Sequence, residues 1–267
     1  VDFSASMNDD WSGGNKSKIE DLKDTLELVT DELGKFNAVT PGVKHRVSLT
    51  GYNRRTVNAN NNGKLVFRDQ RIVTKMGEYD KDDVVNFNKT IEKQFEVKGA
   101  AKRIPNGDEA AVFTDIFYTE DFDGFMKQVR TFKASGGTAS LQGIIRAGQI
   151  VTSLAQNPNQ LIIILSDGED WNHYAGQTNK LVNKGMCTNI KNMINGGKVS
   201  ADNLNDDIAV VDGVSPGKFT PWGEAMNARM SVIGFDYDLH ANTGLLNCVG
   251  KDNVFKAENK QDILNKI

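Results

Sequence analysis

The apolar residues of the chain recur with two periods that alternate along the sequence. A step of three or four residues predicts one apolar face of a helix, and this spacing occurs first at Ile19, Leu22, Leu26, Val29 and Leu33. Ser17 and Glu20 have the spacing of a capping box at its start, and Gly34 predicts its end. The same helical spacing predicts further helices over residues 122–132, 141–154, 182–193 and 263–267.

Short apolar or alternating runs between these helices predict strands. Leu161–Leu165 is continuously apolar, which is typical of a strand covered on both faces of a parallel sheet. Other strands are predicted at residues 1–3, 47–51, 230–235 and 254–257. The repeated order of strand, helix and strand predicts an α/β fold with a doubly wound, mostly parallel central sheet and helices on both faces.

Two irregular segments interrupt this order, and we interpret them as insertions into a single domain of residues 1–267. The first covers about residues 56–115 and contains a strand-like alternation at 84–97, and the second covers about 196–227. Val1 lies in what reads as the last part of a strand. We therefore expect the domain to be truncated on its N-terminal side, with an export signal or membrane anchor further upstream.

Composition excludes several classes of function. The 32 Lys and Arg residues are outnumbered by 35 Asp and Glu, for a net charge of -3, so nucleic acid is not expected as a partner. No apolar run approaches the roughly 18 residues that span a bilayer. His45, His173 and His240 lack the spacing of a zinc site. Two cysteines, Cys187 and Cys248, leave both one disulfide and two buried thiols open.

Oxygen-bearing side chains lie in three predicted loops, each of which follows a predicted strand or precedes a predicted helix. Asp2, Ser4 and Ser6 alternate along one strand end, Thr138 lies just before the helix at 141–154, and Asp167 follows the strand at 161–165. In a parallel sheet such loops meet at one edge. Three hydroxyls and two carboxylates suit a hard divalent cation, with Mg²⁺ expected and Mn²⁺ or Ca²⁺ as alternatives.

This arrangement resembles the von Willebrand factor type A (vWA) family, which has a Rossmann-like fold. The metal-ion-dependent adhesion site of that family, written Asp-x-Ser-x-Ser, then Thr, then Asp, matches Asp2, Ser4, Ser6, Thr138 and Asp167. The resemblance implies that these five residues hold the ion and that a partner protein supplies an Asp or Glu carboxylate to it. It implies a non-catalytic adhesion module.

A second resemblance covers most of the chain. Tyr52-Asn-Arg54, Ser135-Gly-Gly-Thr138, Ile233-Gly-Phe235 and Leu246-Asn-Cys248 look similar to segments of the bacterial Tad (tight adherence) pilus-assembly proteins. This resemblance implies a Cys187–Cys248 disulfide and an extracytoplasmic domain anchored to the membrane in the full-length protein. It also implies a partner such as a pilin, an envelope protein or a host-surface protein.

Several residues have two interpretations. Trp11, Trp171 and Tyr174 fall in the predicted site loops, where they either pack the loop bases against the sheet or contact a partner. Glu169 and Asp170 are expected to be solvated charges and not additional ligands.

Two other functions compete with adhesion: a Mg²⁺-dependent phosphate-ester hydrolase using Asp2 and Asp167, and a purely structural domain of an envelope assembly.

Overall fold

The computed structural model describes residues 1–11, 15–59, 64–96, 99–101, 110–171, 173–195, 226–235, 237 and 242–265. The helices are α1 (Lys18–Val39), α2 (Phe87–Glu92), α3 (Phe122–Val129), α4 (Ser140–Leu154), α5 (His173–Asn183), α6 (Met186–Ile194), α7 (Thr243–Val249) and α8 (Lys260–Leu264). Short 3₁₀ turns are η1 (Ala5–Asn8), η2 (Asp80–Asp82) and η5 (Lys251–Asn253). The strands are β1 (Val47–Leu49), β2 (Thr56–Ala59), β3 (Leu65–Asp69), β4 (Val73–Lys75), β5 (Val84–Val85), β6 (Ala100–Ala101), β7 (Ile116–Thr119), β8 (Asn159–Ser166), β9 (Asn227–Phe235) and β10 (Val254–Ala257).

Parallel strands form the centre of the molecule. β8, β9 and β10 make a parallel sheet in the order β10-β9-β8, with Ile162 opposite Met230 and Val232 opposite Val254. β1 and β7 form a separate antiparallel pair. Residues 1–3 lie between the two sheets, with one hydrogen bond to β8 and others to the segment after β1. The predicted α/β architecture is thus confirmed, whereas a single continuous doubly wound sheet stays a prediction.

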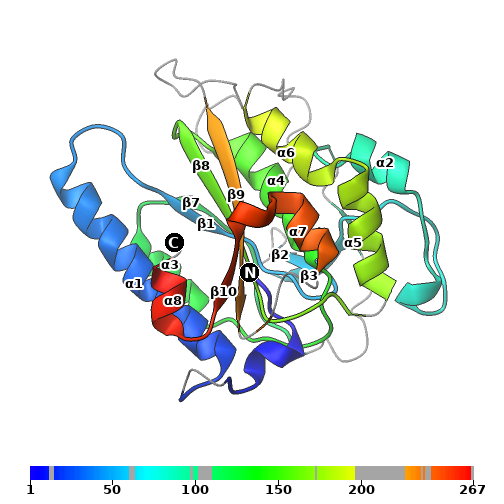
Figure 1. Ribbon diagram of the computed structural model, residues 1–267, viewed down its shortest axis with the longest axis horizontal. Coiled ribbons are helices and arrows are strands. Elements are labelled where there is room, and N and C mark those ends of the chain that lie inside the picture. The colour runs from blue at the N-terminus through cyan, green and yellow to red at the C-terminus, as the bar shows by residue number, and fades with distance from the viewer. Residues whose placement is uncertain are drawn as a thin grey trace.

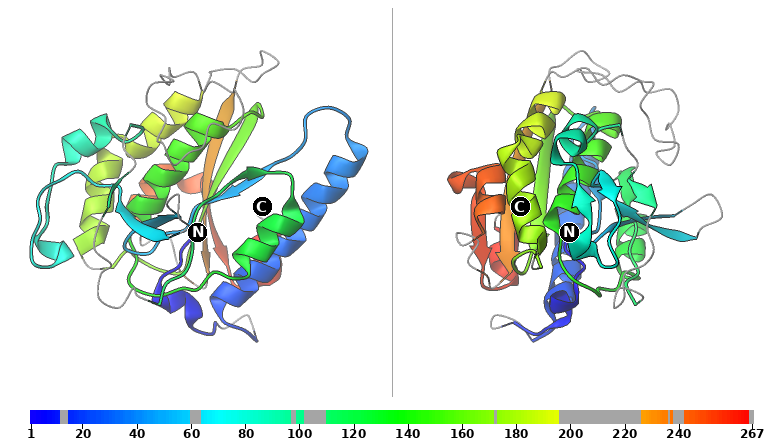
Figure 2. Two further views of the ribbon diagram at one scale, coloured as in Figure 1. Left: turned by 180° about the vertical axis from the view of Figure 1, so that it is seen from behind. Right: turned by 90° about the vertical axis from the view of Figure 1, so that its right-hand side faces the viewer.

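Helices cover both faces of the parallel strands, as Figures 1 and 2 show from different sides. Alternate side chains of each strand enter different cores: Ile162 and Ile164 pack with α4, α5 and α6, while Leu165 and Phe235 pack with α1 and α3. This division follows from the two-residue period of a strand. It also explains why the sequence of β8 is apolar on consecutive positions.

Two predicted helix boundaries differ from those in the structure. α1 continues past Gly34 to Val39, and Ser17 lies at its N-cap without a side-chain capping hydrogen bond. The single helix predicted over 182–193 is two helices, because Gly185 between them has φ +93°, a left-handed conformation that interrupts the helix.

The first predicted insertion contains ordered elements of its own. β2, β3 and β6 form a small antiparallel sheet, and β4 pairs with β5. The strand predicted over 84–97 is wrong for residues 86–96, because Asn86 accepts a hydrogen bond from the Lys89 amide and starts helix α2. Residue 97 lies outside the described residues. The second predicted insertion lies outside the described residues except at 226–227.

Among the described helices, none combines the length and the apolar character that a bilayer crossing requires.

Candidate metal site

Residues 1–3 bring the Asp-x-Ser-x-Ser motif to the carboxyl end of β8. The Asp2 amide donates to the Leu165 carbonyl over 2.9 Å, and the Phe3 amide donates to the Tyr52 carbonyl over 2.7 Å. Because this segment is parallel to its neighbours, Asp2 and Asp167 reach the same edge of the sheet. The chain then turns into η1, which carries Ser6.

Hydrogen bonds connect four of the five predicted ligands into one group. Asp2 Oδ1 accepts from the Ser4 amide at 2.8 Å, and Asp2 Oδ2 accepts from Ser166 Oγ at 2.9 Å. Ser4 Oγ and Ser6 Oγ are 3.1 Å apart, and Ser6 Oγ donates to Asp167 Oδ1 at 3.0 Å. The structure therefore brings together Asp2, Ser4, Ser6 and Asp167.

The fifth predicted ligand, Thr138, lies in a loop that is fastened to this group. The Ala5 amide donates to the Gly136 carbonyl and the Trp171 amide donates to the Thr138 carbonyl, both over 2.8 Å. Thr138 is buried. Within the described residues its hydroxyl makes no hydrogen bond to the other four side chains, so its part in a metal site stays a prediction.

Lys18 is a functional candidate that the sequence did not reveal. Its Nζ lies 2.9 Å from Asp167 Oδ2 and 3.5 Å from the Ser6 carbonyl oxygen. Lys18 is the first residue of α1, and only the fold shows that the start of this helix faces Asp167. An ammonium thus lies beside two of the predicted ligands.

The site is rich in buried negative charge. Burial, and then the negative charge of Asp167, raises the pKa of Asp2 to about 7 despite its hydrogen bonds from Ser4 and Ser166. A divalent cation would favour the ionised form of such a carboxyl group.

The donor set fits a hard cation. All candidate atoms are oxygens of carboxylates or hydroxyls, the ligands that Mg²⁺ prefers over nitrogen and sulfur. In the described part of the chain no three His, Cys, Asp or Glu residues are grouped to hold a metal, so the hydroxyls are essential to the candidate site.

The three aromatic residues of the site loops differ in exposure. Trp11 is buried, donates from Nε1 to Asp21 over 2.7 Å and packs edge-on against Phe235. Tyr174 is also buried, and its hydroxyl donates to Asp80 Oδ2 over 3.1 Å. Trp171 is 46% exposed. A partner-binding role stays a prediction. Of the three aromatic residues, only Trp171 has the exposed surface that such a role needs.

Asp170 differs from its predicted solvated state, whereas Glu169 is exposed as expected. Asp170 accepts from the amide of Ser140 at 2.6 Å and from the Ser140 and Thr178 hydroxyls. Burial raises the pKa of Asp170. The carboxylate thus joins the start of α4 to α5 behind the site, a role that the sequence pattern did not predict.

A buried ionic cluster attaches the first predicted insertion to the same side of the molecule. Arg71 contacts Asp69 at 2.7 Å and Asp83 at 3.0 Å, and Arg55 contacts Asp80 at 2.5 Å. The neighbouring arginines hold the pKa of Asp69 well below its usual range. Asp69 also accepts from the Gln142 side chain of α4 over 2.9 Å, and Arg71 donates to the Gln177 side chain of α5 over 2.8 Å, so the cluster anchors the insertion to these two helices. Removing one charged member would leave a buried charge without its partner.

The implied disulfide is confirmed. Cys187 on α6 and Cys248 on α7 are joined, with their Cα atoms 5.3 Å apart. Both lie in the core on the α4 side of the sheet. The bond therefore links two helices that cover the same face.

Comparison with known proteins adds distant structural likenesses. No protein-family model and no curated protein matches the chain. Among solved structures it is similar to the vWF domain of the type V pili tip protein Mfa5 from Porphyromonas gingivalis, with a TM-score of 0.46 and 13% identity over 99% of this chain and 89% of that chain. It is also similar to proximal thread matrix protein 1 from the mussel byssus, with a TM-score of 0.42 and 14% identity over 100% of this chain and 41% of that chain. Both TM-scores are below 0.5, so neither likeness supports a statement about function.

Proposed function

We propose that this protein is a metal-dependent binding module that engages a carboxylate of a partner protein through Mg²⁺. The observation that carries the proposal is the hydrogen bond from Ser6 Oγ to Asp167 Oδ1, which joins two loops 161 residues apart in the sequence. It supports a shared function for the residues of the adhesion motif. Asp2, Ser4, Ser6 and Asp167 would hold the ion, with Thr138 as the fifth ligand.

The charge balance favours an anionic partner. A divalent ion beside two ionised carboxylates is neutral as a group, and the Lys18 ammonium adds one positive charge. Mg²⁺ takes about six oxygen ligands in octahedral geometry and retains waters that an incoming ligand can replace. An Asp or Glu side chain supplies the negative charge and oxygen atom that such a site lacks.

The rim offers one exposed aromatic contact. Trp171 lies next to the Thr138 loop, and the Arg54 guanidinium is 5.3 Å from its ring centroid. Exposed tryptophan and arginine side chains are frequent anchors of protein interfaces. We assign Trp171 as the partner contact beside the metal.

The proposed setting is a bacterial surface or pilus assembly of the Tad type, outside the cytoplasm. The Cys187–Cys248 disulfide supports this location, because disulfides persist mainly in oxidising compartments. The Tad relationship and a membrane anchor rest on the sequence resemblance. A pilin, an envelope protein or a host-surface protein are the corresponding partners.

Calorimetric titration with MgCl₂ and MnCl₂ tests the metal site. We expect binding by the unmodified chain, and its loss in Asp2→Ala and in Ser4→Ala combined with Ser6→Ala. Ser17→Ala is the matched control, since this serine makes no side-chain capping hydrogen bond. Circular dichroism verifies that each variant is folded. Unchanged Mg²⁺ affinity in the folded variants would contradict the site.

Partner binding is tested with immobilised peptides that carry Asp or Glu and matched peptides that carry Asn or Gln. Retention of the acidic peptides should require Mg²⁺ and be abolished by EDTA. Turnover of a phosphate ester that is lost in Asp2→Asn would instead support the hydrolase. Metal-dependent melting without any metal-dependent partner would support the purely structural role.

A further inference from the structure

Large apolar side chains are exposed on the hairpin that β4 and β5 form in the first predicted insertion. Met76 is 66% exposed, Tyr79 60% and Val84 52%. Single exposed apolar residues are ordinary on a protein surface, whereas several that gather on one element mark a contact surface. We call Met76, Tyr79 and Val84 the hairpin tip.

Buried charges beneath the hairpin tip hold it in place. Arg71 contacts Asp83 at 3.0 Å, and Asp83 also accepts from the Gly77 amide over 3.1 Å. Asp80, the neighbour of Tyr79, contacts Arg55 in the same ionic cluster. A surface that is already held in one conformation loses less conformational entropy when it binds, so these anchors favour recognition of a partner.

The same anchors connect the hairpin tip to the rim of the candidate metal site. The Tyr174 hydroxyl donates to Asp80 Oδ2 over 3.1 Å, and the Tyr174 amide donates to the Trp171 carbonyl over 3.0 Å. The Trp171 amide in turn donates to the Thr138 carbonyl. Figures 1 and 2 show the turn η2, in cyan, beside α5. Along this series of contacts, Trp171 lies between the candidate metal site and the hairpin tip.

The chemical character of the surface changes between its two ends. A bound divalent ion with the Lys18 ammonium leaves the metal end positive. On the hairpin, two positive and two negative exposed side chains cancel, which are those of Lys75, Lys81, Glu78 and Asp82. The apolar side chains are therefore what distinguishes the hairpin end. A partner that is acidic at one end and apolar at the other complements both.

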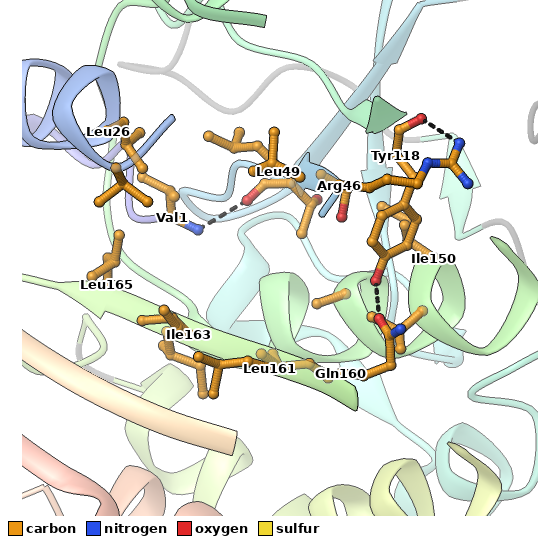
Figure 3. Close-up of a pocket in the computed structure, with 18 of the residues that line it drawn as sticks. Val1, Leu26, Arg46, Leu49, Tyr118, Ile150, Gln160, Leu161, Ile163 and Leu165 are labelled. Atoms are coloured by element: carbon orange, nitrogen blue, oxygen red, sulfur yellow. Dashed lines mark hydrogen bonds between the residues drawn. The ribbon is translucent and has the colours of Figure 1, made fainter. Parts of the chain in front are cut away.

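An apolar cavity of about 370 Å³ lies elsewhere in the molecule, between β8 and β1 (Figure 3). Its lining includes none of the five predicted ligands, and neither Trp171 nor the hairpin tip. A partner at the candidate site would therefore rest on exposed side chains and would not enter this cavity. Contact of this kind suits a segment of another protein better than a small molecule, which binds in a concave pocket.

We propose that Trp171 and the hairpin tip form one docking surface for a segment of the partner protein. An Asp or Glu of that segment binds the metal, and large apolar side chains of the same segment cover Trp171, Tyr79 and Met76. The inference rests on the metal-dependent binding proposed above and specifies its partner: an acidic residue alone is not sufficient for tight binding. It also gives the first predicted insertion a role in recognition.

Three fluorescently labelled peptides test the docking surface. The first carries one Asp in a Gly-Ser background. The second carries the same Asp and a Leu-Trp-Leu block, placed at one of several distances on either side of it. The third keeps this block and has Asn in place of Asp.

Peptide affinities are measured with Mg²⁺ and with EDTA for the unmodified chain and for Met76→Ser combined with Tyr79→Ser. Phe36→Ser is the matched control, since Phe36 is a similarly exposed residue on α1. Calorimetric titration with MgCl₂ measures the metal affinity of each protein. All three replaced side chains are exposed, so the variants should fold.

At the best distance, we expect the second peptide to bind the unmodified chain about tenfold more tightly than the first peptide does, with Mg²⁺ present. The double variant should lose this gain and retain its affinity for Mg²⁺ and for the first peptide. Phe36→Ser should retain all three affinities.

An equal gain in the double variant, or no gain at any distance while the first peptide still binds, would overturn this inference and leave the metal-dependent function standing. Equal binding of the second and third peptides in EDTA would overturn the shared surface. Absence of Mg²⁺-dependent binding by every peptide would contradict the proposed function and this inference with it. A dimer of the unmodified chain that becomes a monomer in the double variant, as measured by sedimentation, would assign the hairpin tip to a second copy of the chain instead.

Discussion

Replacing Lys18 by methionine should tighten Mg²⁺ binding. The Lys18 ammonium lies 2.9 Å from Asp167 Oδ2, and the two side chains are only 13% and 1% exposed. A cation that binds Asp167 and Ser6 must share that carboxylate with the ammonium or displace it. Methionine retains the length and the apolar stem of lysine and removes the charge.

The size of this gain in Mg²⁺ affinity follows from the repulsion between the two positive charges. A unit charge and a divalent ion about 5 Å apart repel by about 7 kcal/mol at an effective dielectric constant of 20 and by about 2 kcal/mol in water. Because the lysine can swing toward solvent, only part of this repulsion acts on the bound ion. We expect a gain of at least about 1.4 kcal/mol, or tenfold in affinity.

Without metal, the same substitution should be unfavourable and lower the stability of the folded protein. Loss of the ammonium leaves the buried Asp167 carboxylate with fewer favourable contacts, and breaking such a pair costs about 3 kcal/mol when it is fully buried. The folded protein without metal should therefore be less stable than the unmodified chain. Added Mg²⁺ should then raise the melting temperature of Lys18→Met by more than that of the unmodified protein.

Calorimetric titration at pH 8 measures the affinities, and Lys16→Met provides the control. Lys16 has a side chain 55% exposed and contacts Asp24, away from the candidate ligands. Its replacement should leave Mg²⁺ affinity unchanged. Equal or weaker binding by Lys18→Met would refute the competition, and weaker binding would indicate that the ammonium positions Asp167 for the metal.

Two further predictions concern pH and the disulfide. Burial raises the pKa of Asp2 from 3.8 to about 7, so the folded state binds this proton more tightly than the unfolded state. Without metal, the free energy of unfolding should fall as pH rises across that interval, and urea denaturation should show a weaker fall in Asp2→Asn. The Cys187–Cys248 bond closes a loop between residues 61 positions apart in the sequence. Reducing it should lower the free energy of unfolding by about 4 kcal/mol in the chain-entropy model. Urea titrations with and without dithiothreitol measure this difference. A matching titration of the Cys187→Ser, Cys248→Ser double variant should show no effect of dithiothreitol.

Periodicity predicted the elements whose apolar residues face a core over several consecutive turns or positions. The α4 helix is buried along most of its length, and the apolar run of β8 faces one core on each side of the sheet, so their spacing alone identified them. α2 was missed because it is a short helix whose start depends on the side chain of Asn86. The spacing of apolar residues gives little information about such an N-cap when the residues that follow it also alternate between apolar and polar.

The candidate site was predictable where it depended on strand ends and unpredictable where it depended on packing between loops. Asp2 and Asp167 follow apolar strand residues, which placed them at one edge of the sheet. The contact of Lys18 with Asp167 depends on where the fold places the start of α1. The burial of Asp170 requires partners on α4 and α5. Neither relationship leaves a periodic signal in the sequence.

Strand register, more than loop sequence, determines whether the candidate site exists. The bond from the Asp2 amide to the Leu165 carbonyl fixes residues 1–3 against β8, and Ser6 then reaches Asp167. A slip of one residue would turn Asp2 toward the opposite face and separate it from Ser166. The few backbone bonds of residues 1–3 resist such a slip.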